Sequence, residues 1–149
     1  MREQKFRFIF KDGNFFAKRY MTLDELLDSN FALEQMEESI NSESNIFDIE
    51  DYPDYEVFKD EYTGLKDKNN MEIYEGDIFS FVIFDYLDNA IPYISSVVFQ
   101  QGSFGVLIKN SYNEECFYEL YHILSQYDEA KVIGNIYENK DLLSEVNNG

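Results

Sequence analysis

Apolar and polar residues alternate at the start of the chain, in the stretch KFRFIFKDGNFFAKRY. Phe6, Phe8 and Phe10 alternate with Arg7 and Ile9, and an Asp-Gly pair at 12–13 tolerates the positive φ of a tight turn. This pattern predicts a β-hairpin. Its outer face is expected to carry much of the limited positive charge and to attract the acidic remainder of the chain; the cations concerned are Lys5, Arg7, Lys18 and Arg19.

The spacing of apolar residues becomes helical after this hairpin. Thr22 and Glu25 match a capping box, in which each residue's side chain bonds the backbone N–H of the other. Because Ser29-Asn30 interrupts the pattern, the sequence does not decide between one short helix and two. The apolar positions that support them are Leu23, Leu26, Leu27, Leu33, Met36 and Ile40.

The segment 41–61 is strongly acidic and contains Pro53, which stops any helix crossing it. Its aromatic and aliphatic residues, as in Tyr55-Glu56-Val57-Phe58, predict a partly packed loop with a short strand.

The pattern beyond residue 78 is that of short strands separated by turns. Residues 114–126 fit either a strand or a helix, with a weak preference for a strand, and 141–149 form at most a helical turn with a frayed end. The chain is therefore expected to be mainly β with a minor α component, as a small barrel or sandwich. The predicted strands are 78–84, 93–100, 104–109 and 130–137, with turns near 85–89 and 101–103.

The central stretch EYTGLKDKNNMEIYEGDIFSF, from Glu61 to Phe81, fits no ligand-binding template. A P-loop would need a second glycine in register and a Lys-Ser/Thr pair, and an EF-hand would need an oxygen ligand and a turn glycine where Met71 and Glu72 stand. The stretch instead predicts a turn at Gly64, a polar connection over 67–70, a short strand over 72–74 and a turn at 76–77.

Charge narrows the function more than any other property of the composition. The chain has 30 acidic and 12 basic residues, a formal net charge of −18 and a pI of about 4.2. Binding to nucleic acid or to an anionic membrane depends on Lys and Arg, so direct binding to either is not expected. A basic protein is the natural partner.

Cysteine and histidine chemistry is sparse, because Cys116 and His122 are the only residues of their types. No disulfide or thiol metal cage can form within the chain, and the surrounding NEECFYELYHIL has no nucleophile signature. No apolar run reaches the ~20 residues that span a bilayer, and the N-terminus lacks an apolar signal core. We expect a soluble protein of the cytoplasm.

The chain resembles the YopX family of small phage and prophage proteins. The resemblance rests on YTGLKDKN at 62–69, EIYEGDI at 72–78, GSFG at 102–105 and VIGNIYEN at 132–139, and on the MRE-x-KFR start. Asn70-Met71 stands where Gly-Lys is more typical of the family, and 30–60 contains no matching motif.

The resemblance implies an SH3-like β barrel over 62–140, preceded by a mixed N-terminal part over 1–61 and followed by the tail 141–149. It implies a bacterial host cell and no reaction, so there is no catalytic residue to carry over. No cofactor and no metal are expected. The shared motif is interpreted as structural; its residues are Tyr62, Thr63, Gly64, Leu65, Asp67, Ile73, Tyr74, Gly76 and Asp77.

The leading hypothesis is a non-catalytic accessory protein that binds a basic or nucleic-acid-binding protein of the host or phage, in its sharper form as an acidic inhibitor or DNA mimic. The oligomeric state is left open. Its partner-binding face is predicted to comprise Asp24, Glu25, Asp28, Glu34, Glu37, Glu38, Asp48, Glu50, Asp51, Asp54 and Glu56.

Two alternatives belong to other classes. One is a metal-dependent hydrolase that uses carboxylates alone. The other is a peptide-binding SH3-like module with an aromatic groove, to which Tyr62, Tyr74, Tyr86, Tyr93 and Tyr112 are candidates to contribute.

Overall fold

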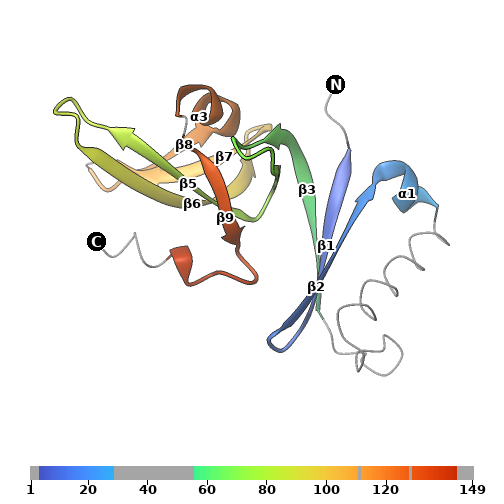
Figure 1. The fold of residues 1–149 in the computed structure, drawn as a ribbon. Coiled ribbons are helices and arrows are strands. Elements are labelled where there is room, and N and C mark those ends of the chain that lie inside the picture. Colours follow the sequence, from blue (N-terminus) through green and yellow to red (C-terminus); the bar gives the residue numbers. More distant parts are fainter. Residues whose placement is uncertain (1–3, 29–55, 111, 128, 144–149) are drawn as a thin grey trace. The chain divides into compact units, whose positions relative to one another are not determined.

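The computed structural model describes residues 4–28, 56–110, 112–127 and 129–143. The chain divides into two compact units, Met1–Tyr62 and Thr63–Gly149, and the secondary structure is mainly antiparallel β (Figure 1). One sheet has the strand order β2-β1-β3-β4 and the other β8-β7-β6-β5-β9. Among the described residues, no helix has the length and apolar character needed to cross a membrane.

The predicted N-terminal hairpin is confirmed in unit one. β1 (Lys5–Asp12) pairs with β2 (Phe15–Thr22), and Gly13 in the turn between them has a φ of 60°, which glycine adopts without strain. On its other edge β1 pairs with β3 (Glu56–Lys66), so β1 is a central strand.

A helix follows the hairpin directly, as the capping box predicts. α1 (Leu23–Leu27) begins after Thr22, whose Oγ1 accepts the N–H of Glu25 at 3.3 Å while Glu25 Oε1 accepts the N–H of Thr22 at 3.2 Å. The predicted second helix lies outside the described residues, as does the first residue of the strand expected at 55–58.

The prediction that Arg7 lies on the solvent face of the hairpin is wrong. Phe8 and Phe10 are buried on one face of β1, and Arg7 and Ile9 are buried on the other. Arg7 donates to Asp60 on β3, with Nη2 to Oδ2 at 2.8 Å. The pattern misled because a central strand of this unit can be covered on both faces.

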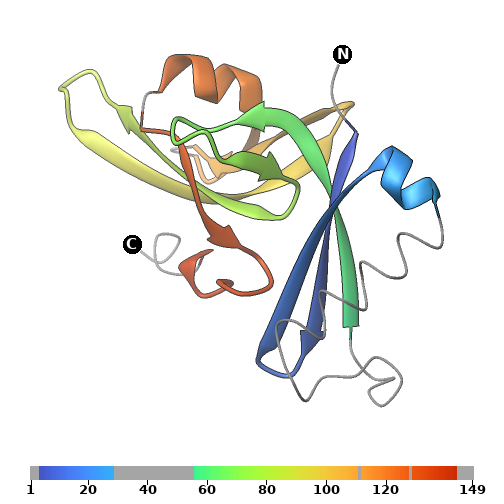
Figure 2. The same ribbon diagram turned by 45° about the vertical axis from the view of Figure 1, so that its right-hand side comes forward.

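Unit two contains β4 (Glu72–Tyr74), β5 (Asp77–Phe84), β6 (Ala90–Gln100), β7 (Ser103–Lys109), β8 (Glu115–Glu119) and β9 (Lys131–Asn135) (Figure 2). β9 returns to pair with β5, and the register shifts between Ile78 and Phe79 at a bulge. β8 and β9 are the two edges of the five-stranded order, so no closed barrel is found among the described residues. The expected barrel is therefore not confirmed.

Two local predictions in this unit are only partly right. Residues 114–126 divide between β8 and a helix, α3 (Leu120–Gln126), so both readings of the ambiguous pattern are present. Gly64 does not end a strand in a turn, because β3 continues to Lys66 with Gly64 at a φ of 85° inside it. That positive φ bends the strand without terminating it.

The core of unit two is larger than that of unit one. Unit one buries Phe8, Phe10, Ala17 and Met21. In unit two, α3 contributes Leu120 and Ile123 to a continuous apolar cluster under the sheet. The remaining members of that cluster are Ile73, Phe79, Phe81, Val97, Phe104, Val106, Ile108 and Ala130.

Candidate functional site

The polar residues of the YTGLKDKN and EIYEGDI motifs bond the backbone. Thr63 Oγ1 donates to the carbonyl oxygen of Ile73 at 2.7 Å and accepts the N–H of Leu65 at 3.2 Å. Asp77, which is 2% exposed, accepts the N–H of Tyr74 at 2.8 Å. These bonds hold β3, β4 and the start of β5 together around the buried side chains of Ile73 and Tyr74.

Asp67 connects this region to the C-terminal strand. Its Oδ1 accepts the N–H groups of Asn69 and Met71 at 2.9 and 3.0 Å, and its Oδ2 accepts the N–H of Val132 at 3.0 Å. One buried carboxylate thereby closes its own loop and attaches that loop to β9. The geometry suits the structural role predicted for the motif, and that role stays a prediction.

Four of the eleven residues of the predicted acidic face lie in the described part of the chain, so this face stays a prediction. Glu25 is engaged in the capping box, and Asp24, Asp28 and Glu56 are exposed. The other members lie outside the described residues: Glu34, Glu37, Glu38, Asp48, Glu50, Asp51 and Asp54.

The five candidate tyrosines separate into buried and exposed rings. Tyr62 and Tyr74 are buried, and Tyr93 stacks on Phe81 with ring centroids 5.6 Å apart. Tyr86 and Tyr112 are 93% and 80% exposed, in the loops that precede β6 and β8. The peptide-binding alternative would therefore use Tyr86 and Tyr112, whose rings are exposed.

Cys116 and His122 do not form a dyad. Asn110 Nδ2 donates to Cys116 Sγ at 3.6 Å, whereas His122 is exposed on α3, and no contact between the two is found among the described residues. Within the same residues there is also no group of three or more His, Cys, Asp or Glu side chains that could hold a metal ion.

Three loops of unit two share one construction: 67–71, 85–89 and 110–114. In each, the side-chain oxygen of the first residue accepts the N–H groups of the third and fifth residues, at 2.8 to 3.0 Å. The first and fifth residues also pair through the backbone, and the fourth has a positive φ. An Asp or Asn is needed at the first position because its short side chain reaches its own loop backbone.

The loop at 85–89 has an additional electrostatic consequence. The backbone N–H of Asn89, followed by the Asn89 side chain and the N–H of Leu87, holds the pKa of Asp85 below its ordinary value, although desolvation opposes this shift. The ionised carboxylate therefore fixes the loop that displays Tyr86 and Leu87 to solvent.

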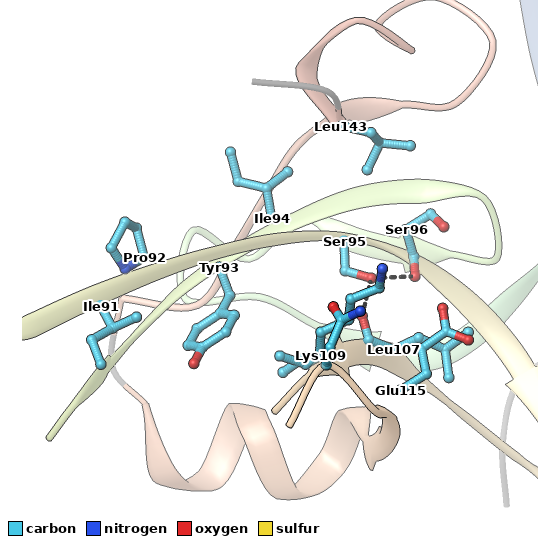
Figure 3. Close-up of a pocket in the computed structure, with 12 residues that line it drawn as sticks. Ile91, Pro92, Tyr93, Ile94, Ser95, Ser96, Leu107, Lys109, Glu115 and Leu143 are labelled. Atoms are coloured by element: carbon cyan, nitrogen blue, oxygen red, sulfur yellow. Dashed lines mark hydrogen bonds between the residues drawn. The ribbon is translucent and has the colours of Figure 1, made fainter. Parts of the chain in front are cut away.

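An open groove of about 600 Å³ lies between β6 and β7 (Figure 3). Six consecutive residues of β6, 91–96, and three of β7, 107–109, line it. Because successive side chains of a strand point to opposite faces, a groove that touches every residue in turn must lie against the strand edges. Asn113, Glu115 and Leu143 complete its lining.

The groove exists because two strands diverge. β6 and β7 pair only over Val97–Gln100 with Ser103–Val106, while β6 continues along β5 and β7 continues along β8. At the point of divergence, Ser95 Oγ donates to the carbonyl oxygen of Leu107 at 3.0 Å. A side-chain hydroxyl thus stands where the next backbone hydrogen bond between the strands would be expected.

A model of the YopX protein family matches residues 4–144. The chain belongs to the YopX family. This YopX protein is also similar to a crystal structure of protein EF1440 from Enterococcus faecalis, with 20% identity, a TM-score of 0.43, and coverage of 96% of this chain and 99% of that chain. A comparison with curated proteins gives no match.

Two glycines in the YopX motifs are required by close packing. A Cβ on Gly105 would overlap the backbone carbonyl of Tyr118 and the ring of Phe117, so glycine lets β7 approach β8. A Cβ on Gly134 would lie 2.5 Å from Asn139 Oδ1, the atom that accepts the N–H of Asn135. Sequence inspection singled out these motifs without indicating what the glycines contact.

The groove was missed by the sequence interpretation, although Pro92 is a signal for it. Proline has no N–H to donate, so within a sheet it is confined to positions whose N–H faces away from a neighbouring strand. Pro92 lies inside β6, opposite Val82 of β5. The presence of Pro92 indicates that the edge of β6 that faces away from β5 is not paired with another strand at this position.

Proposed function

We propose that this YopX protein is a non-catalytic accessory protein of a phage or prophage that binds a basic protein in the bacterial cytoplasm. The observation that carries this proposal is the imbalance of 30 acidic and 12 basic residues. In addition, some of the basic residues form ion pairs within the chain. Arg7 is buried against Asp60, and Lys68 Nζ lies 3.1 Å from Glu129 Oε2. Arg7 therefore offsets no surface carboxylate, whereas the exposed Lys68 offsets one, Glu129.

The sharper form of the proposal is an acidic inhibitor that presents carboxylates in place of nucleic-acid phosphates. Duplex DNA carries one charge per about 1.7 Å, so a protein that binds it has a surface already suited to a dense acidic array. The residues assigned to this array remain those of the N-terminal acidic segment, from Asp24 to Glu56.

A peptide-binding module is the second candidate, favoured by the groove between β6 and β7. The return of β9 to β5, the bulge at Ile78–Phe79 and the sharing of the long β6 between β5 and β7 support a curved, SH3-like arrangement of the five strands. Such a module would bind protein without catalysing a reaction, so it belongs to the same broad function.

Affinity capture from a nuclease-treated bacterial lysate, at low and high salt, tests the proposal. We expect a basic protein to be captured at low salt and lost at high salt, because exposed charge interactions are screened. Capture of no basic protein, or equal capture at both salt concentrations, would contradict it.

The acidic-array form is tested with one variant that carries five substitutions: Glu34→Gln, Glu37→Gln, Glu38→Gln, Asp51→Asn and Asp54→Asn.

A matched control removes the same number of charges from unit two. If only the first variant loses the partner, the N-terminal acidic segment is the binding face. If only the control loses it, binding involves unit two and the acidic-array form is rejected. The control substitutions are Asp88→Asn, Glu114→Gln, Glu115→Gln, Glu119→Gln and Asp141→Asn, all at exposed positions.

A further inference from the structure

We propose that the groove between β6 and β7 binds an extended basic peptide segment of a partner protein, which pairs as an added strand with the open edges of these two strands. The inference rests on the proposed protein-binding function and assigns it a site and a ligand class. Strand addition uses backbone hydrogen bonds for affinity and alternate side chains for specificity.

Three observations establish which backbone groups of β6 face the groove. Pro92 cannot donate toward β5, and the carbonyl oxygen of Val97 accepts the N–H of Gly76, on the side away from β7. Backbone groups alternate between the two edges along an antiparallel strand. Because β6 pairs with β5 in continuous register, Ile94 and Ser96 share the direction of Pro92 and present their N–H and C=O groups to the groove.

The facing edge is supplied by β7. The carbonyl oxygen of Leu107 accepts the Ser95 hydroxyl, which places the Leu107 backbone on the side of β6. By the same alternation Lys109 faces the groove, while Ile108 faces its partner Cys116 on β8. In the described part of the chain, the β6–β7 pairing stops at Val97 and Val106, before it reaches Ile94 and Lys109.

The side chains around the groove suit a peptide whose residues alternate. Figure 3 shows Pro92 and Ile94 on one side of β6 and Ile91 and Tyr93 on the other. Tyr93 is held by stacking on Phe81, so it offers a fixed apolar surface. One face of an added strand would meet this surface, and its other face would be solvated.

Charge at the groove selects a basic peptide. Glu115 and Lys109 are the two charged residues of the lining in the described part of the chain. Asp85, Asp88 and Glu114 lie in the adjoining loops that lead into β6 and β8. Lys109 is also directly opposite Glu115 in the β7–β8 register, which offsets its charge. Lysine or arginine on the solvated face of the peptide would be attracted to these carboxylates.

The two loops beside the groove are already ordered by their own bonds. Asp85 accepts the N–H groups of Leu87 and Asn89, and Asn110 accepts those of Tyr112 and Glu114. A site whose flanking loops are fixed before binding loses less conformational entropy when the ligand arrives.

The test uses fluorescein-labelled nine-residue peptides that alternate valine and lysine, with binding to the full chain followed by fluorescence anisotropy. One peptide is unmodified, a second carries N-methyl groups on every valine amide, and a third carries them on every lysine amide. Each methylated peptide has one strand edge blocked. Because the proposed peptide pairs with both β6 and β7, we expect each methylated peptide to bind at least tenfold more weakly than the unmodified peptide. The protein's amide signals of Ile94, Ser96 and Lys109 should shift in NMR spectra when the unmodified peptide is added and should not shift with the methylated ones.

A matched pair of variants on β6 locates the site. Ile91→Ser, in the groove, is expected to weaken binding several-fold, whereas Phe99→Ser, exposed on the same strand but outside the groove lining, is expected to leave it unchanged. Equal effects of the two substitutions would overturn the assignment of the site.

The outcomes separate this inference from the proposed function. If all three peptides bind with equal affinity and binding falls with salt, strand pairing is wrong while binding of basic chains stands. If no peptide binds at low salt, the groove inference is overturned, and the capture experiment, which does not use these peptides, decides the proposed function independently.

Discussion

Asp60 and Asp67 are both buried carboxylates, one within β3 and one just after its end, yet their negative charges are stabilised in different ways. Asp60, in unit one, meets the guanidinium of Arg7, and both side chains are about 5% exposed. Asp67, in unit two, accepts three backbone N–H groups and pairs with no cation among the described residues. The same charged group is thus held once by a side chain and once by the backbone.

The difference matters in a chain with few cations. Twelve Lys and Arg residues are too few to pair with 30 carboxylates, so carboxylates that serve the fold must use other donors. Backbone N–H groups in turns supply those donors without adding positive charge. Asp77, Asp85 and Asp67 all follow this second route. The fold therefore stays acidic even where it buries charge.

The largest expected effect is on the ion pair. Arg7→Ala leaves the Asp60 carboxylate buried without its charge partner and is expected to lower the free energy of unfolding by about 3–5 kcal/mol. The double variant Arg7→Met, Asp60→Leu removes both charges and should recover most of that loss. Urea unfolding followed by circular dichroism measures both, and a double variant less stable than Arg7→Ala would show that the pair itself is strongly stabilising.

A smaller loss is expected for the carboxylate held by the backbone. Asp67→Ala removes the acceptor of three N–H groups and should lower the free energy of unfolding by about 2–3 kcal/mol. Asp67→Asn keeps one carbonyl oxygen and should lose less. The same unfolding measurement checks both, and equal losses for the two variants would mean that the oxygen that Asn retains contributes nothing, and that the whole loss comes from the bond to the Val132 N–H.

The loop at 85–89 separates the effect of donors from the effect of burial. Asp85 has the same bonds within its loop as Asp67 but lies in a surface loop, where water replaces any bond that is lost. Asp85→Ala is therefore expected to change stability much less than Asp67→Ala in the same urea experiment. A comparable loss would show that loop closure, and not burial, sets the effect of both residues.

The smallest effect concerns pH. The pKa of Asp85 is lowered in the folded chain, so its contribution is present above its ordinary pKa and is lost as pH falls through the lowered value. The amide signals of Leu87 and Asn89 should therefore shift only in that acidic range. In Asp85→Asn this shift should vanish while the loop persists, because Asn110 builds the same loop with a neutral amide. An NMR pH titration of both chains measures it.

Local signals in the sequence predicted local structure well. The hairpin over 5–22 and the capping box at Thr22 depend on residues close together in the chain, and both are present. The burial of Arg7 depends on Asp60, 53 residues away, and was predicted wrongly. Residues 114–126 carry both periodicities because a strand and a helix follow each other without a break.

The groove could not be derived from periodicity, because it results from where two paired strands separate. The hydrophobic alternation in β6 shows which side chains share a face of the strand, but it does not show which edge of the strand is paired. Only Pro92 distinguishes the paired edge from the unpaired one. The acidic residues illustrate the opposite difficulty. Their abundance made a charged face easy to predict, but abundance alone does not determine which carboxylates lie together.

Pro92 also limits how copies of the chain can associate with one another. An open strand edge invites the same edge of a second molecule, and repeated pairing of that kind leads toward fibrils. Because Pro92 offers no N–H at the outer end of the groove, such a ladder would be interrupted shortly after Ile94. The groove can stay open in a concentrated solution while its own proline discourages polymerisation.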